Sequence, residues 1–111
     1  MLQITTRDEK GCTLVTVGGR MDAVTSPEFE KKCGACLDTG ARRLVIDLGG
    51  LEYISSAGLR SVLVIAKRVK SASGGLALFG LKGVVDEVFT ISGFRDLLPI
   101  AGSLDEALAK V

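Results

Sequence analysis

The chain has 111 residues, of which 47% are apolar and 24% charged, and this length allows one domain with its own core but not two. Its formal net charge is +1, and no block of like charge suggests nucleic acid or a membrane surface as a partner. Because histidine is absent, Ser-His and Cys-His nucleophiles are excluded, and the three cysteines alone make a poor zinc site or disulfide framework.

The N-terminal segment predicts a β-hairpin. Residues 2–7 and 12–17 have the composition of strands, and residues 8–11 between them are typical of a turn. The glycine pair at residues 18–19 then ends the second strand, and residues 20–23 form a loop.

The next segment predicts a helix that begins at a Thr-Ser-Pro-Glu run and ends at Gly40. Either Ser26 caps this helix, with Pro27 at the first helical position, or Thr25 and Glu28 form a capping box. Its apolar face consists of Phe29, Cys33, Cys36 and Leu37.

A buried strand and a serine-bearing helix form the centre of the sequence. Residues 44–46 are a short apolar run that predicts the strand, and Asp47 with the glycine pair at residues 49–50 ends it. A helix then begins at Ser55 and Ser56, where the apolar period changes to that of a helix. Its apolar face consists of Leu59, Val62, Leu63, Ala66 and Val69, and its exposed side carries Arg60, Lys67 and Lys70.

The last third predicts one more buried strand and two more helices. Residues 76–79 are the strand, and a helical pattern follows that stops at Gly93. Residues 97–100 are a short edge strand or merely extended, because they contain a proline. Ser103 and Glu106 predict a capping box for a C-terminal helix. The apolar face of the first of these helices consists of Val84, Val85, Val88 and Phe89. That of the C-terminal helix consists of Leu104, Ala107 and Leu108.

These elements together predict the fold class. The order strand, helix, strand implies a right-handed crossover between parallel strands, whereas the N-terminal hairpin is antiparallel. We therefore expect a single α/β domain over residues 1–111, with a mixed sheet of four to five strands and about four helices packed on it.

The serine pair is the main candidate site. A serine at a helix N-terminus either caps the helix or, when phosphorylated, places an anion where the helix dipole favours it. Asp22 lies in the loop after the second strand, and this loop and the serine loop share one end of the sheet if the two strands are parallel neighbours. Asp22 is then expected near Ser56, although an ordinary polar loop is an equally good interpretation.

A second candidate is the Cys33-Gly34-Ala35-Cys36 run, which has the spacing of a redox dithiol. Reactive pairs of this kind open a helix, where the dipole stabilises the thiolate, but this pair lies late in its predicted helix. Buried small hydrophobic side chains are the better interpretation.

Three segments carry a resemblance to a known family. They are GRMDAVTSPEFE at residues 19–30, VIDLGGLEYISSAGLRSVL at residues 45–63 and VFTISGFRDLLPIAGSLDEAL at residues 88–108. The whole chain resembles the STAS domain, in particular the stand-alone bacterial anti-sigma factor antagonists. The middle segment is the most specific of the three.

This resemblance implies partner switching without catalysis and without a cofactor or metal. In this family the unphosphorylated antagonist binds an anti-sigma factor, usually a serine kinase of GHKL type, and the sigma factor is released. The kinase phosphorylates a serine of the antagonist, which weakens binding, and a PP2C-type phosphatase removes the phosphate.

The resemblance also implies the site residues. The family's acceptor serine lies two residues before a glycine, which places it at Ser56 before Gly58. Ser55 stands where the family commonly has aspartate, which makes it the rival acceptor, and Ala57 stands where serine or threonine is common. Asp22 matches the family's loop aspartate. The expected partner-binding residues are Asp22, Ser55, Ser56, Ala57, Gly58 and Arg60.

Two other functions compete with switching. One is a STAS subunit that is never phosphorylated and serves as a scaffold in a transport or stress complex. The other is a small hydrolase with Ser56 as nucleophile. This function is poorly supported, because no histidine can activate the serine and Lys67 and Lys70 are two to four helical turns distant from it. No apolar run approaches the ~20 residues of a membrane span and no signal-peptide pattern is present, so we expect a cytoplasmic protein.

Overall fold

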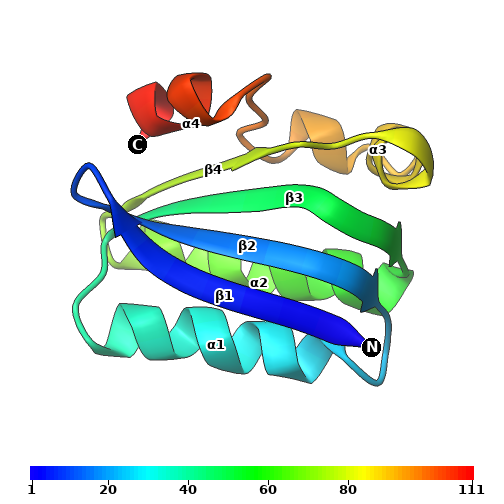
Figure 1. Cartoon of the computed structure of the whole chain (residues 1–111), viewed down its shortest axis with the longest axis horizontal. Coiled ribbons are helices and arrows are strands. Elements are labelled where there is room, and N and C mark those ends of the chain that lie inside the picture. Colours follow the sequence, from blue (N-terminus) through cyan, green and yellow to red (C-terminus); the bar gives the residue numbers. More distant parts are fainter.

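A four-stranded mixed sheet in the order β1-β2-β3-β4 carries α1 and α2 on one face, with α3 and α4 beside β4 (Figure 1). The structure is a computed structural model that describes all residues, Met1–Val111. This architecture confirms the predicted α/β class, with four strands rather than five. The elements are β1 (Leu2–Glu9), β2 (Cys12–Met21), α1 (Ser26–Asp38), β3 (Arg43–Ile54), α2 (Ser56–Ser71), β4 (Gly75–Phe79), α3 (Gly83–Ile91), the 3-10 turn η1 (Phe94–Asp96) and α4 (Leu104–Lys110).

The predicted hairpin is present, with a tighter turn. Glu9 pairs with Cys12, so only Lys10 and Gly11 form the connection between β1 and β2. Both have positive φ, at 51° and 80°, as a two-residue type I′ turn requires. The long hairpin leaves the carboxyl end of β2 at the opposite end of the sheet from this turn (Figure 1).

The prediction that glycine pairs end β2 and β3 was wrong. Both strands continue, and Gly18 pairs with Gly50 across the parallel ladder at a point where the register shifts. A Cβ atom on Gly18 would lie 3.4 Å from the Gly50 carbonyl oxygen. The glycines therefore allow the two backbones to approach closely, and Arg20 and Met21 belong to β2 rather than to a loop.

Strand β2 pairs in parallel with β3, and β3 in parallel with β4. Helix α1 connects the first pair and α2 the second, as the order of elements predicted. Because the strands are parallel, the segments that follow β2 and β3 leave the sheet at the same edge. Met21 is paired with Ile54 at that edge, which places the start of α1 beside the start of α2.

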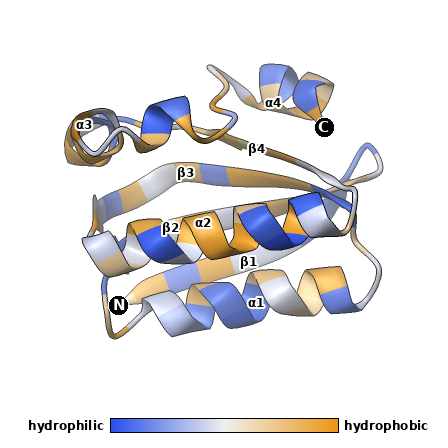
Figure 2. Cartoon of the chain, turned by 180° about the vertical axis from the view of Figure 1, so that it is seen from behind, coloured by the Kyte–Doolittle hydropathy of each residue, from blue (hydrophilic) through white to orange (hydrophobic).

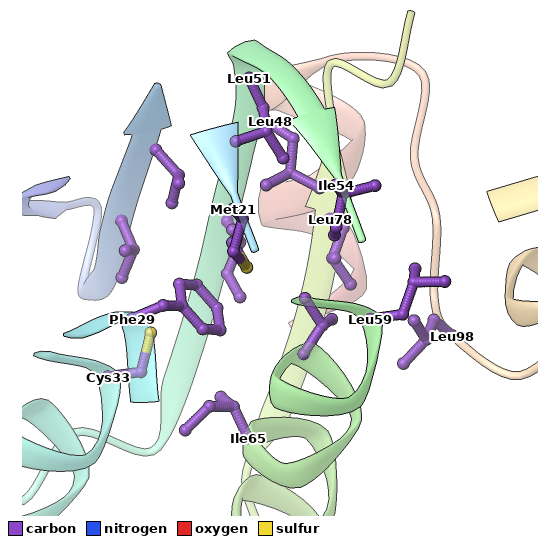
Figure 3. Packing of buried hydrophobic residues seen from close by; sticks show 14 of the residues in the cluster. Met21, Phe29, Cys33, Leu48, Leu51, Ile54, Leu59, Ile65, Leu78 and Leu98 are labelled. Atoms are coloured by element: carbon purple, nitrogen blue, oxygen red, sulfur yellow. The ribbon is translucent and has the colours of Figure 1, made fainter. Parts of the chain in front are cut away.

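The larger core lies between the sheet and the helices α1 and α2 and extends to Val85 and Phe89 of α3 (Figure 3). Helix α1 contributes Phe29 and Cys33 to this core, whereas Cys36 is only half-buried. A smaller cluster on the opposite face joins Val45 and Ala77 of the sheet to Ala107 of α4. The sheet is thus covered on both faces where its strands are parallel.

The buried face of α2 is rotated from the predicted one. Leu59, Val62 and Val69 are buried as expected, but Leu63 and Ala66 are only half-buried. Ile65, outside the predicted apolar face, is fully buried, and Figure 3 shows it pointing into the space between α1 and α2. The rotation follows because α2 packs against both the sheet and α1.

The C-terminal third confirms the two predicted helices but not a fifth strand. Ile100 makes a single parallel bridge with Leu78, but Leu97 keeps a helical backbone conformation at the end of η1, so residues 97–100 form neither a strand nor one extended segment. Ser103 caps α4, since its Oγ accepts a hydrogen bond from the Glu106 N–H at 3.2 Å. No helix in this structure has the length and apolar character that crossing a bilayer requires.

Replacing Ile65 with alanine should lower the free energy of unfolding by about 2–5 kcal/mol, because it would leave a cavity in the core. Leu63→Ala is the matched control on the same helix and should cost less, since Leu63 is half-exposed. Urea unfolding followed by circular dichroism measures both changes. A larger loss for Leu63→Ala would contradict the observed rotation of α2.

Candidate functional site

Two polar segments meet at the carboxyl edge of the parallel strands. The Ser55 N–H donates a hydrogen bond to the Met21 carbonyl oxygen at 2.9 Å. Asp22, the next residue after Met21, therefore lies beside the start of α2, as the parallel arrangement predicted. Polar residues at this edge of an open α/β sheet commonly form ligand or partner sites.

Asp22 organises the loop between β2 and α1. Its Oδ1 accepts hydrogen bonds from the N–H groups of Val24 and Thr25, at 3.0 and 3.1 Å. The backbone hydrogen bond from Thr25 is the main cause that lowers the pKa of the Asp22 carboxyl group. The carboxylate is thus charged and already bonded to its own loop, so its direct role is to hold the loop in shape.

Thr25 completes this loop and does not cap α1. The Thr25 hydroxyl accepts a hydrogen bond from the Asp22 N–H at 2.9 Å and donates one to the Arg20 carbonyl oxygen at 2.8 Å. Thr25 occupies the N-cap position, but its side chain makes no capping hydrogen bond, and Ser26 is the first helical residue. Both predicted caps of α1 were therefore wrong. Ser26 lies within the helix, and the Thr25 hydroxyl bonds to the loop instead of capping the helix.

Ser55, rather than Ser56, caps α2. Ser55 has an extended backbone, and its Oγ accepts a hydrogen bond from the Gly58 N–H at 3.3 Å. Ser56 follows as the first helical residue, and its side chain is exposed. An interpretation of Ser56 as the cap is therefore wrong, because the helix begins at Ser56 itself, one residue earlier than a cap at that position would require.

Gly58 holds α2 against the ends of the strands. A Cβ atom at this position would lie 2.7 Å from Ile54 Cγ1 and 2.9 Å from the Met21 carbonyl oxygen. Ala57 is half-buried and Arg60 is exposed. Among the predicted site residues, Ser56 and Arg60 are therefore the ones that face solvent most openly.

Sequence reasoning missed two features of this edge. Arg20 pairs with Tyr53 across the ladder, and its guanidinium carbon lies 4.3 Å from the centre of the Tyr53 ring, a cation–π contact. Val24 projects from the Asp22 loop with 86% of its surface exposed. The cation–π contact depends on the strand register, which the sequence does not show because the glycine pair predicts a loop at Arg20. The exposure of Val24 depends on the conformation of the Asp22 loop.

The cysteine pair lies away from this edge, within α1. Cys33 is fully buried, and burial raises the pKa of its thiol to about 12. Burial also raises the pKa of the half-buried Cys36 thiol. Both shifts favour the protonated thiol and so count against a reactive dithiol. Burial supports the interpretation as a core side chain for Cys33, whereas Cys36 is only half-buried. No group of three or more carboxylate or cysteine side chains is placed to hold a metal ion.

Comparison with known proteins gives a consistent result. The family model described as the STAS domain matches residues 3–107. A Bordetella bronchiseptica protein, BtrV, whose name places it among the anti-sigma factor antagonists, is 43% identical over 99 residues, 89% of this chain and 85% of BtrV. The anti-sigma-B factor antagonist of Staphylococcus aureus is 28% identical over 86 residues, 78% of this chain and 80% of that protein.

A solved structure agrees with these relatives. The crystal structure of an anti-sigma factor antagonist from Mycobacterium paratuberculosis superposes with a TM-score of 0.88 at 26% identity. The match covers 98% of this chain and 92% of that one. The similarity thus extends over the whole fold, including the edge that carries the serine pair.

Replacing Ser55 with alanine should lower the free energy of unfolding by about 0.5–2 kcal/mol, because the capping bond to the Gly58 N–H is lost. Ser56→Ala is the matched control and should change stability by less, since Ser56 does not cap. Thermal and urea unfolding measure both. Equal losses for the two variants would contradict the assignment of the cap.

The Cys33 thiol should resist alkylation in the native protein at pH 8, because it is buried and its pKa is about 12. Iodoacetamide followed by mass spectrometry of peptides measures the labelling of each cysteine. The control is the same reaction in about 6 M guanidinium, which unfolds most domains. Cys33 should be labelled under this condition. Rapid native labelling of Cys33 would revive the redox interpretation.

Proposed function

Because this chain belongs to the STAS domain family, we propose that it is an anti-sigma factor antagonist that acts by switching partners. Its partner is an anti-sigma factor that is also a serine kinase of GHKL type, and binding releases a sigma factor. It acts in the cytoplasm and is a regulator rather than an enzyme. The observation that carries the proposal is the exposed Ser56 side chain, which opens α2 beside the Asp22 loop.

Ser56 is the proposed phosphate acceptor. Its side chain is exposed and is not used as a cap. Ser55 is the weaker candidate, because the residue is half-buried and its Oγ accepts a hydrogen bond from the Gly58 N–H. A kinase that phosphorylates Ser55 would first have to break this bond, whereas Ser56 presents its hydroxyl without any rearrangement of the helix.

The switching chemistry follows from the two proposed enzymes. The kinase transfers the γ-phosphoryl group of ATP to Ser56 Oγ, so that the new O–P bond replaces the bond to the β,γ-bridging oxygen and ADP leaves. The hydroxyl proton passes to a base of the kinase. A PP2C-type phosphatase reverses the modification with water, which gives inorganic phosphate and the free hydroxyl.

Phosphate at this position would act on the partner and not on the fold. It adds about −1.5 to −2 charges at neutral pH, and the N-terminus of α2 accommodates an anion through its dipole. A partner surface that closely contacts Ser56 would then meet a bulky dianion. A loss of ~3 kcal/mol at this contact would reduce affinity about a hundredfold.

The test begins with unphosphorylated protein as bait, followed by purification of the kinase that it captures. Incubation with this kinase and ATP should place phosphate on Ser56, and peptide mass spectrometry identifies the residue. Ser56→Ala should remain folded, bind the kinase and remain unphosphorylated. Ser56→Asp should remain folded, because a carboxylate suits the first helical turn, and should bind weakly.

Ser55→Ala is the control and should leave phosphorylation intact. Phosphate on Ser55 alone would move the acceptor by one residue. Absence of phosphate on both serines would favour the second function, a STAS scaffold subunit of a transport or stress complex that works without phosphorylation.

A further inference from the structure

Helix α2 carries an unbalanced charge on its exposed side. Its sixteen residues include four basic side chains and no acidic one. Three of the four, Arg60, Lys67 and Lys70, are exposed and belong to none of the three ion pairs in the structure. The fourth, Arg68, forms an ion pair with Asp38 of α1 and so has a partner within the fold.

The three unpaired cations lie on one line with Ser56. The successive positions Ser56, Arg60, Leu63, Lys67 and Lys70 are separated by four, three, four and three residues, a spacing that keeps side chains on one face of a helix. We name these five residues the α2 stripe. Figure 2 shows hydrophobic and hydrophilic residues alternating along the ribbon of α2.

An apolar groove runs beside the stripe. It has a volume of about 330 Å³ and lies between α2 and the segment after η1 that contains Leu97. No acidic side chain contributes to its wall, and the side chain of Leu97 is 66% exposed there. The residues that line it include Leu63, Ala66, Leu76 and Leu97, with Lys67 and Lys70 at its rim.

Helix stability explains only part of this pattern. Lys70 lies in the last turn of α2, where a cation interacts favourably with the helix dipole. Arg60 is the fifth residue of the same helix, near the end where the dipole favours anions instead. A cation that the helix does not need, aligned with two others beside an apolar groove, indicates a surface for an acidic partner.

We propose that the α2 stripe and its groove bind an acidic amphipathic helix of the anti-sigma factor. Apolar side chains of that helix fill the groove beside Leu63 and Leu97, and its carboxylates pair with Arg60, Lys67 and Lys70. This inference rests on the proposed function and specifies the partner surface that Ser56 controls. The switch serine then lies at one end of the docking surface and the groove at the other.

The same geometry explains how phosphate on Ser56 would act. Ser56 and Arg60 are four residues apart on one helix, so their side chains are neighbours. A phosphate on Ser56 would pair with Arg60 and remove this cation from the partner. It would also place a dianion on a surface that otherwise attracts carboxylates, which weakens binding through repulsion.

The first test uses the purified anti-sigma factor kinase captured by the unphosphorylated protein. The double variant Lys67→Glu, Lys70→Glu should weaken its binding at least tenfold, lower the association rate and reduce the dependence of affinity on salt. Lys31→Glu, Lys32→Glu on α1 makes the same change of charge on two exposed lysines and should bind normally. Circular dichroism verifies that both variants are folded.

A Leu97→Ser variant tests the groove from outside α2 and should also weaken binding. Normal binding of both stripe variants, with loss of binding in Ser56→Asp, would overturn the inference and leave the proposed function intact. Equal weakening by the α1 control would also overturn it, because net charge alone would then explain the effect. Normal binding of Ser56→Asp would instead count against the proposed switch.

The pairing of the phosphate with Arg60 has its own readout. In protein phosphorylated on Ser56, a titration by ³¹P NMR should give a lower phosphate pKa than in the Arg60→Gln variant, because a neighbouring cation favours the dianion. Arg68→Gln is the matched control and should leave this pKa unchanged, since Arg68 contacts α1. Equal pKa values in all three proteins would overturn the pairing.

Discussion

The close approach of α2 to the ends of β2 and β3 is the constraint on which the site depends. Gly58 makes it possible, because any side chain at this position would collide with the Met21 carbonyl oxygen and with Ile54. The same carbonyl oxygen accepts the Ser55 N–H, so the helix is joined to the strand by a hydrogen bond as well as by packing. The first turn of α2 is therefore held in a defined place, with Ser56 as its outermost residue.

This constraint divides the residues of the site into two groups. Asp22, Ser55 and Gly58 use their distinctive chemistry within the fold, as a loop clamp, a helix cap and a contact without a side chain. The side chains of Ser56 and Arg60, in contrast, are exposed to solvent. A change of charge on Ser56 can consequently alter the surface without disturbing the structure beneath it, which suits a switch that must remain folded in both states.

The charge on α2 fits the same requirement. The proposed control by phosphate would need a surface on which added negative charge has a large effect, and a row of unpaired cations is such a surface. The ion pair between Arg68 and Asp38 shows the contrast, because there the charge serves the contact between two helices. In the proposed complex, the apolar groove beside the row would add burial of hydrophobic surface, which supplies affinity that charge alone does not.

The sequence by itself determined the hairpin, the helices, the parallel order of the later strands and the position of the serine pair, because these follow from local patterns and from the order of elements. Only the tertiary structure decided that the facing pair Gly18 and Gly50 continues two strands, that Ser55 is the cap, and that Ile65 rather than Leu63 is buried. Each of these outcomes depends on a contact between segments far apart in the chain. Local preferences carry no information about such contacts, since the partner backbone is absent from any short stretch of sequence.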